Sequence, residues 1–224
     1  MSQEIAELKA KQPSFKAPHL VILQLGDNPA SSTYIRMKLR AAEESGMTVE
    51  HVQVPSAGSG GVARVLELVR KSNEDPRVNG LLVQLPLEGA SPEQERQVVE
   101  AVSPGKDVDG FHPENIGHLS SRMSDPLFVP CTPAGVVKLI DSTGVSLAGA
   151  NAVVLGRSDI VGTPVCALLR RRDATVTQCH SRTQNLKEIL KEADIVVAAI
   201  GKAEFIKGEW LKPGCVVIDV GANY

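Results

Sequence analysis

The stretch from Ala152 to Thr183 constrains the fold of this chain more than any other segment. It starts with a short apolar run typical of a buried β-strand and passes through a turn bracketed by Gly156 and Gly162. Thr163 and Pro164 are suited to cap and open the helix that follows, and a second strand comes after that helix. Together these elements form a unit whose helix start can bind a phosphate group.

The end of the second strand indicates which dinucleotide such a unit would prefer. An NAD site usually carries Asp or Glu there, because a carboxylate binds the ribose 2′-hydroxyl. Here the strand is followed by Ser181 and Arg182, and Arg157 stands in the glycine turn. Hydroxyl and guanidinium groups suit a 2′-phosphate, so the pattern favours NADP. The strict G-x-G-x-x-G spacing is absent, so the turn by itself is equally compatible with ordinary turn chemistry.

Composition excludes several classes of partner. The chain has 224 residues, 42% apolar and 22% charged, which is typical of a globular protein able to build two modest cores. A net charge of −2 with scattered charges offers no basic surface to nucleic acid. There is no run of 18 apolar residues, so no membrane span is predicted. We expect a cytoplasmic protein, or a mitochondrial one after removal of a presequence.

The cysteines and histidines of the chain predict neither disulfides nor a metal site. The cysteines are far apart and contain no C-x-x-C pair, so we expect reduced thiols that fill small core positions. The histidines lack a matching pair of metal ligands nearby. The four cysteines are Cys131, Cys166, Cys179 and Cys215.

Strand and helix patterns alternate along the chain, which predicts an α/β protein with parallel strands covered on both faces. We expect two three-layer αβα domains, residues 1–130 and 131–224, with a cleft between them and a Rossmann-like second domain. A loop-rich stretch covers 103–133. The predicted strands cover 19–25, 49–54, 80–84, 152–155 and 174–179, with two more beginning at Ile195 and Val216, and the predicted helices cover 3–11, 32–45, 61–73, 92–102 and 134–142.

The first half of the chain carries polar residues that its scaffold does not require. Tyr34 and Lys38 stand four apart in a predicted helix, so they lie on one face, one turn apart. The helix follows a Gly-Asp-Asn-Pro loop at the carboxyl end of a strand, where ligands bind in open α/β sheets. A lysine on a helix is usually only a solvated charge, but this position aims the pair at a ligand site.

Two further segments reach the same edge of the predicted sheet. Gln84 closes an apolar strand, where a polar side chain needs hydrogen-bond partners, so we expect it to point into a cleft. The Lys-Asp-Val-Asp-Gly segment from Lys106 spaces two carboxylates so that both face one way if the segment is extended. We interpret Asp107 as a solvated acid paired with Lys106. For Asp109 a ligand-facing role and a solvated one both stay open.

Six collinear motifs between about Phe15 and Tyr224 resemble the methylenetetrahydrofolate dehydrogenase/cyclohydrolase family. The resemblance implies NADP-dependent oxidation of 5,10-methylenetetrahydrofolate to the methenyl cation, then hydrolysis of that cation to 10-formyltetrahydrofolate. It also implies a homodimer formed through the nucleotide-binding domains. The motifs are Tyr-x-x-x-Lys at Tyr34, Val-Gln-Leu-Pro-Leu from Val83, Lys-Asp-Val-Asp-Gly from Lys106, Pro-Cys-Thr-Pro-x-Gly from Pro130, Gly-Arg-Ser-x-x-Val-Gly-x-Pro from Gly156 and Gly-Glu-Trp-x-Lys-Pro-Gly from Gly208.

The resemblance and the chemistry together assign roles to single residues. Lys38, held by Gln84, would orient water or a substrate nitrogen and move a proton. Asp109 would accept hydrogen bonds from the pterin N–H groups, and Tyr34 would stack on the flat substrate. Arg157 and Ser181 would hold the 2′-phosphate. The remaining substrate-binding residues would be Val83 and Leu85, and the remaining cofactor-binding residues Gly156, Ser158 and Ala222.

The chain departs from this family at its ends, which keeps other functions open. Family members continue past the strand at Val216 through a Pro-Gly-Gly-Val-Gly-Pro loop, a last strand and a long helix, so we expect the second domain to be incomplete. One alternative is another two-domain NADP dehydrogenase resembling shikimate dehydrogenase. The other is a truncated domain that only binds nucleotide or a partner chain. Intact Tyr34, Lys38, Gln84 and Asp109 favour chemistry.

Overall fold

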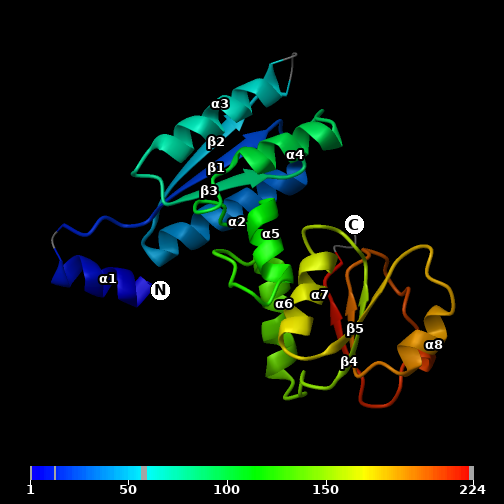
Figure 1. Cartoon of the computed structure of the whole chain (residues 1–224). Helices are drawn as coiled ribbons and strands as arrows, with labels where there is room; N and C mark the ends of the chain where they lie inside the picture. The colour runs from blue at the N-terminus through cyan, green and yellow to red at the C-terminus, as the bar shows by residue number, and fades with distance from the viewer. Residues whose placement is uncertain (1, 13, 57–59, 222–224) are drawn as a thin grey trace. The chain divides into compact units, whose positions relative to one another are not determined.

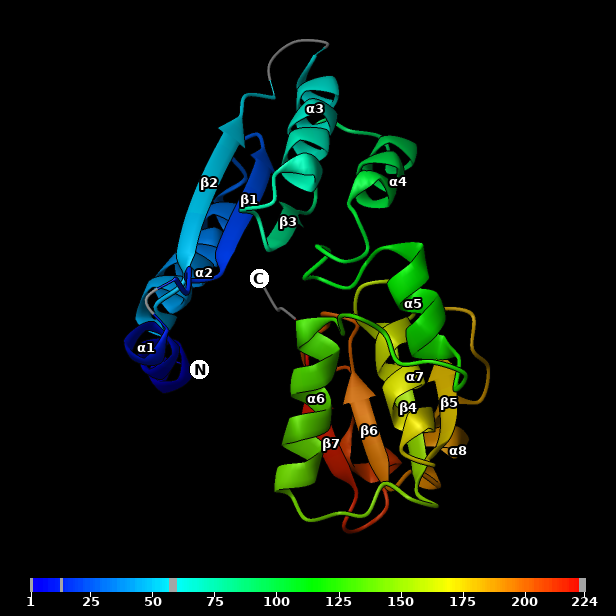
Figure 2. The ribbon, with the colours of Figure 1, turned by 60° about the vertical axis from the view of Figure 1, so that its left-hand side comes forward.

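The computed structural model describes residues 2–12, 14–56 and 60–221, which form two compact units, Met1–Pro113 and Glu114–Tyr224. Each unit is a parallel β-sheet with helices packed on both faces, as Figures 1 and 2 show. The predicted α/β class is therefore confirmed. The chain divides geometrically after Pro113, and a division into functional domains at residue 130 stays a prediction.

The sheet of unit 1 has β1 at its centre and the order β2-β1-β3, with all strands parallel. Its strands are β1 (His19–Leu25), β2 (Thr48–Val54) and β3 (Gly80–Gln84). The register places Gln24 of β1 opposite Gln53 on one side and Gln84 on the other. Paired residues on neighbouring strands point to the same face of a sheet. Three glutamines therefore form one row near the carboxyl edge, where open α/β sheets bind ligands.

Two helix layers cover the sheet of unit 1. Helix α2 (Pro29–Ser45) covers one face, where Ile22 of β1 packs against Ile35 and Leu82. Helices α3 (Gly61–Glu74) and α4 (Pro92–Ala101) cover the other face, because alternate residues of a strand point to opposite layers. Helix α1 (Ser2–Lys11) contacts α2. The buried residues on the α3 and α4 side include Val21, Leu23, Leu25, Val65, Val69 and Val98.

Unit 2 has a four-stranded sheet with the order β5-β4-β6-β7. Strand β4 lies between its sequence neighbour β5 and β6, so the strand order changes direction at β4, and ligands bind at such a switch point. Helices α6 and α7 cover one face and α8 the other. The elements are α5 (Pro113–Ser120), α6 (Cys131–Ser142), β4 (Asn151–Leu155), α7 (Gly162–Arg171), β5 (Thr175–Cys179), α8 (Leu186–Lys191), β6 (Ile195–Ala198), the 3₁₀ turn η1 (Gly208–Trp210) and β7 (Val216–Asp219).

The helices differ from the prediction more than the strands do. Helix α2 begins three residues before the predicted start, because the Asn28 side chain accepts hydrogen bonds from the N–H groups of Ala30 and Ser31, and Pro29 takes the first helical position. Helix α6 likewise begins at Cys131 rather than at residue 134. Two short helices, α5 and α8, were not predicted at all.

The four thiols are free, and three of them lie in the interior as expected. Cys166 and Cys179 are buried and Cys215 is half-buried. Burial raises the pKa of the Cys166 thiol to about 11, which keeps it protonated. Cys131 is exposed at the start of α6, so the prediction of a core position is wrong for it. Among the described residues, no helix combines the length and apolar character needed to cross a membrane, and no cluster of three potential metal ligands occurs.

Candidate functional site

Lys38 and Gln84 are joined at the carboxyl end of β3. The Lys38 Nζ donates a hydrogen bond to Gln84 Oε1 at 3.1 Å, and Gln84 Nε2 donates to the Leu85 carbonyl at 2.9 Å. Both side chains are half-buried. Since the amide nitrogen can only donate and the amide oxygen can only accept, these two bonds fix one orientation of Gln84. The oxygen of Gln84 faces the ammonium group.

Helix α2 positions Tyr34 and Lys38 relative to the sheet. Ile35, between them in sequence, is 2% exposed and fixes the buried face of the helix on Ile22. Tyr34 and Lys38 lie one turn apart, and Tyr34 is 48% exposed. An exposed aromatic ring one turn from a half-buried ammonium group is available for a flat ligand to stack on.

The segment that carries the two aspartates runs beside β3. Asp107 forms a parallel bridge with Leu81, and the Leu81 N–H donates to the Lys106 carbonyl at 2.7 Å. Gly80 allows the segment to approach closely, because a Cβ there would lie 2.6 Å from Cγ1 of Val108. The segment is therefore held against the strand that ends in Gln84.

Asp107 and Lys106 do not form the solvated ion pair expected from the sequence. Asp107 is 4% exposed, and its Oδ2 accepts a hydrogen bond from the His112 N–H at 2.8 Å. Lys106 points its ammonium group at three backbone carbonyls near the end of α3, those of Ser72, Asn73 and Asp75, each at 2.8 Å. The interpretation of Asp107 as a solvated acid is wrong, because Lys106 anchors the segment and turns Asp107 inward.

Asp109 is electrostatically coupled to both Lys38 and Asp107. Burial raises the pKa of the Asp109 carboxyl to about 6, the positive charge of Lys38 lowers it in part, and the negative charge of Asp107 raises it further. An ammonium group held by an amide and a half-buried carboxylate thus lie close to each other in unit 1. Such a group of donors and acceptors can bind a heterocycle that carries N–H groups.

The other two residues predicted to bind substrate lie mainly in the core. Val83 is buried among the residues that face α3 and α4, and Leu85 packs against the same cluster. Leu85 contributes its carbonyl to the site by accepting the Gln84 hydrogen bond. The side chains of Val83 and Leu85 thus support the strand end from the core.

In unit 2 the glycine turn after β4 has space for nothing larger than glycine. Gly156 has φ 123°, and a Cβ on it would lie 2.5 Å from the Ala199 carbonyl oxygen. A Cβ on Gly162 would lie 2.5 Å from the carbonyl oxygen of Gly156. Gly156 thus lets the turn pass close to the residue that follows β6, and Gly162 lets the start of α7 pass close to the turn, at the switch point of the sheet.

The start of α7 is capped differently from the prediction. The Ser158 hydroxyl accepts hydrogen bonds from the N–H groups of Val161 at 3.2 Å and Gly162 at 3.3 Å. Thr163 and Pro164 lie inside the first turn, so the expectation that they cap and open the helix is wrong. Ser158 satisfies two of the free helix-start donors, and it stays exposed in the turn beside Arg157.

A cavity of about 230 Å³ opens at the carboxyl ends of β4 and β5. Ser181 lines it together with Lys202, which follows the end of β6 and was not predicted. Ligands bind at the carboxyl ends of parallel strands, and Lys202 follows such an end at β6 just as Ser181 does at β5, so the sequence carries a signal for it. Arg157 is exposed in the glycine turn, and Ala222 lies outside the described residues. The cavity wall also includes Leu155, Cys179, Leu186 and Phe205.

These features of unit 2 fit a phosphorylated dinucleotide. The glycine turn before α7 is of the kind that lets a pyrophosphate approach the backbone N–H groups at a helix start. The cavity has apolar walls that suit a flat base, while Ser181 and Lys202 supply a hydroxyl and a positive charge. Both the shape of the cavity and the charge of Lys202 therefore suit such a ligand.

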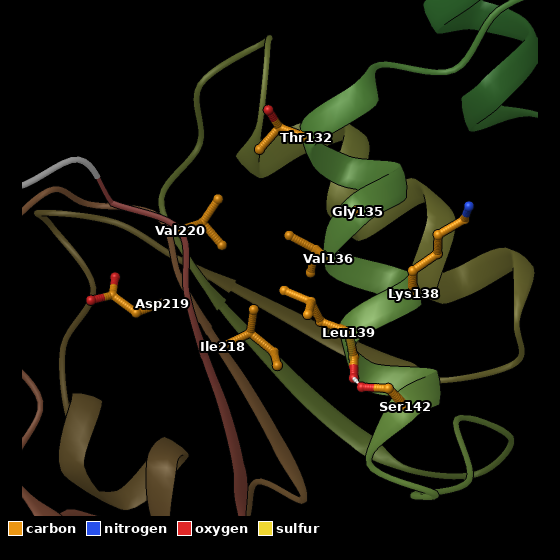
Figure 3. A pocket seen from close by; sticks show the side chains of 9 residues that line it. All are labelled: Thr132, Gly135, Val136, Lys138, Leu139, Ser142, Ile218, Asp219 and Val220. Atoms are coloured by element: carbon orange, nitrogen blue, oxygen red, sulfur yellow. Dashed lines mark hydrogen bonds between the residues drawn. The ribbon is translucent and has the colours of Figure 1, made fainter. Parts of the chain in front are cut away.

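A second hollow of unit 2 is apolar and contains no predicted site residue. It measures about 410 Å³ and lies between α6 and the edge strand β7. Figure 3 shows Val136, Leu139, Ile218 and Val220 pointing into it, whereas Lys138 points away. Leu139 is 55% exposed. This apolar groove has none of the convergent polar groups of the two sites above.

Comparison with known proteins matches both units to one family of enzymes. Residues 1–109 match the model described as the tetrahydrofolate dehydrogenase/cyclohydrolase catalytic domain. Residues 130–224 match the model described as the NAD(P)-binding domain of the same family. The unit with Lys38, Gln84 and Asp109 is thus similar to catalytic domains, and the unit with Gly156 and Ser181 to nucleotide-binding domains.

Single relatives agree with the two family models. The bifunctional protein FolD of Acidiphilium cryptum is 47% identical over 98% of this chain, which covers 76% of that protein. The cytoplasmic C-1-tetrahydrofolate synthase of Spodoptera frugiperda is 50% identical over the whole chain, which spans only 24% of its length. The structure of the Trypanosoma brucei methylenetetrahydrofolate dehydrogenase-cyclohydrolase, complexed with NADP cofactor and inhibitor, has a TM-score of 0.90 and 36% identity, covering 98% of this chain and 73% of that chain.

Proposed function

Because the chain belongs to the tetrahydrofolate dehydrogenase/cyclohydrolase family, we propose that it oxidises 5,10-methylenetetrahydrofolate with NADP and hydrolyses the methenyl product to 10-formyltetrahydrofolate. The observation that carries the proposal is the hydrogen bond between Lys38 and Gln84, coupled to Asp109, in the unit similar to catalytic domains. Those groups are the ones that the second reaction needs. The two family matches also support folate chemistry over an activity like that of shikimate dehydrogenase.

For the oxidation step the protein mainly has to position the substrate and stabilise the cation that develops on it. NADP held by the residues of unit 2 would supply a hydride acceptor for the methylene carbon, so no strong base is required. The Asp109 carboxylate would accept hydrogen bonds from the pterin N–H groups, and its negative charge stabilises the cation that develops. The exposed ring of Tyr34 would stack on the substrate and hold it flat.

The hydrolysis step needs proton movement, which Lys38 can provide. Water adds to the methenyl carbon and forms a C–O bond. The bond from that carbon to N5 then breaks, N5 takes up one of the two water protons, and the other is released. Lys38, oriented by Gln84, would hold the water and pass the proton toward N5. Gln84 accepts from the ammonium group without neutralising its charge.

The nucleotide-binding residues of the proposal lie in unit 2. Gly156 would approach the pyrophosphate, while Arg157, Ser181 and Lys202 would bind the 2′-phosphate. Of the described residues that line this cavity none is acidic, which supports NADP over NAD. Ser158 caps α7 and shapes the same turn.

The proposal also covers the oligomeric state of the protein and its location in the cell. We propose a homodimer through unit 2, which the resemblance of this unit to the nucleotide-binding domains of the family implies. Light scattering of the purified protein tests that state. A cytoplasmic or mitochondrial location is supported by relatives named for both compartments. The net charge of −2 argues against nucleic acid as a partner.

The proposed function is tested by mixing the protein with 5,10-methylenetetrahydrofolate and either NADP or NAD. Reduced cofactor should form with NADP, and methenyltetrahydrofolate added alone should disappear faster than in buffer. If the protein reduced no cofactor and left methenyltetrahydrofolate untouched, the proposal would be wrong. Reduction of NAD at the same rate as NADP would overturn only the choice of cofactor.

A further inference from the structure

A second polar network connects α2 to the sheet of unit 1, apart from the bond between Lys38 and Gln84. Its centre is Gln24, which is 2% exposed near the carboxyl end of the central strand β1. A buried amide that follows the apolar run of residues 20–23 in the strand is costly unless its hydrogen bonds are made. Gln24 therefore needs hydrogen-bond partners, which core packing alone does not supply.

Gln24 links β2 to the first turns of α2. Its Oε1 lies 3.0 Å from Nε2 of His51 and its Nε2 donates to Oγ of Ser32 at 3.2 Å. Because an amide oxygen only accepts, His51 donates to it. The Ser32 hydroxyl donates in turn to Oδ1 of Asp27 at 3.3 Å. The donors thus run in one direction, from the imidazole through the amide and the hydroxyl to the carboxylate.

Helix α2 is attached to the glutamine row at two points. Ser32 bonds Gln24, and Lys38, six positions later, bonds Gln84. Gln24 and Gln84 are register partners on neighbouring strands. Between the two polar attachments the helix touches the sheet through the apolar Ile35. Apolar contacts tolerate small shifts of a helix along its axis, whereas hydrogen bonds lose strength steeply with distance and angle.

We infer that Gln24 and Ser32 are positioning residues that set where α2 lies along the sheet and so place the Lys38 ammonium group on Gln84. Neither residue touches the reacting atoms in this assignment. It rests on the proposed function, because Lys38 is the group that hydrolysis requires. A displacement of about 1 Å at a catalytic group can reduce a rate by roughly 100-fold, so a small shift of α2 is enough to matter.

The test compares two neighbouring hydroxyls of α2. Ser32→Ala removes the attachment to Gln24, while Thr33→Ala removes a hydroxyl that bonds the Pro29 carbonyl within the same helix. Both turnover numbers, for oxidation and for hydrolysis, are measured at saturating substrate in each variant. Their ratio is independent of the fraction of folded protein. We expect hydrolysis relative to oxidation to fall by at least about fivefold in Ser32→Ala and to stay unchanged in Thr33→Ala.

Gln24→Met and Ser32→Thr test the same attachment from its other end and with the hydroxyl retained. Gln24→Met keeps the side-chain volume and removes the hydrogen bonds to His51 and Ser32, so it should lower the ratio of hydrolysis to oxidation as Ser32→Ala does. Ser32→Thr retains a hydroxyl, so its ratio should be close to that of the wild type. Equal losses of both activities in Ser32→Ala and Gln24→Met would overturn the positioning role. A wild-type protein without hydrolysis would instead overturn the proposed function, so the two failures can be told apart.

Discussion

The ammonium group of Lys38 and the amide oxygen of Gln84 are joined by a 3.1 Å hydrogen bond although 46 positions separate the two residues. The strand order β2-β1-β3 explains why these two side chains lie next to each other. Lys38 lies on the helix that follows β1, and Gln84 ends the neighbouring strand β3. A neutral acceptor orients the ammonium group and leaves its charge and protons available, which a carboxylate partner would not do.

Replacing Gln84 by Glu should therefore suppress hydrolysis while keeping Lys38 in place. A carboxylate forms a charge-assisted hydrogen bond with the ammonium group and retains its proton, so we expect the turnover number for hydrolysis to fall by about tenfold or more. Gln53→Glu is the matched control, because Gln53 stands in the same row and donates to the Gly26 carbonyl. Equal rates in Gln84→Glu and the wild type would contradict this role of the amide.

Asp109→Asn should stabilise the fold and weaken substrate binding. Burial raises the pKa of Asp109 from 3.8 to about 6, so the folded protein holds this proton more tightly than the unfolded chain does. The ionised carboxylate thus destabilises the fold above pH 6, and this effect disappears as the pH falls toward 3.8. At pH 7.5 we expect the variant to gain about 1–3 kcal/mol in free energy of unfolding.

The same variant should raise KM for methylenetetrahydrofolate, because the amide offers the pterin N–H groups a weaker acceptor. Urea unfolding at pH 7.5 and pH 4.5 measures the stability difference, which should shrink at the lower pH. Asp159→Asn, at an exposed position, serves as the control for the loss of one negative charge. A variant less stable than the wild type at pH 7.5 would contradict the burial of an ionised Asp109.

Arg157→Ala should weaken NADP far more than NAD. The exposed guanidinium beside the glycine turn is assigned to the 2′-phosphate, which NAD lacks. Loss of a charge-assisted hydrogen bond of this kind corresponds to roughly a 10- to 100-fold increase in Kd. Titration calorimetry with both cofactors measures the difference, and equal losses for both would show that Arg157 does not bind the 2′-phosphate.

Lys202 should contribute to the same phosphate site, and the chain offers a matched control for it. Lys202 lies over the Phe205 ring at 5.9 Å and lines the cavity beside Ser181, whereas Lys187 lies over the Trp210 ring at 5.1 Å and is not among the lining residues. Lys202→Ala should raise the Kd for NADP several-fold, while Lys187→Ala should leave it unchanged. Identical Kd values for the two variants would remove Lys202 from the site.

Strands and their order of appearance could be predicted from the sequence better than helix ends and short helices. The expected strands 19–25 and 80–84 agree with β1 and β3, because a continuous apolar run marks a parallel strand covered on both faces. Helix α2 starts earlier than its apolar pattern, since its start is set by the Asn28 cap. Helices α5 and α8 have eight and six residues, too few for a helical period to stand out.

The individual residue types of the site could be predicted, but their tertiary contacts could not. Gln84 stands out in the sequence as a polar residue at a strand end, and Tyr34 and Lys38 as a pair on one face of the helix that follows a strand. The burial of Asp107 depends on where Lys106 reaches along α3, which no local pattern records. The network around Gln24 likewise joins segments that are distant in the sequence. Sequence reasoning treats such a residue as an ordinary strand position.

The measurement that tests the central claim most directly follows the methenyl absorbance of Lys38→Met with methylenetetrahydrofolate and NADP. If Lys38 carries the hydrolysis and positioning carries the oxidation, the variant should still reduce NADP and should accumulate methenyltetrahydrofolate, whereas the wild type should convert it to 10-formyltetrahydrofolate. Hydrolysis of added methenyltetrahydrofolate by Lys38→Met at the wild-type rate would contradict the account.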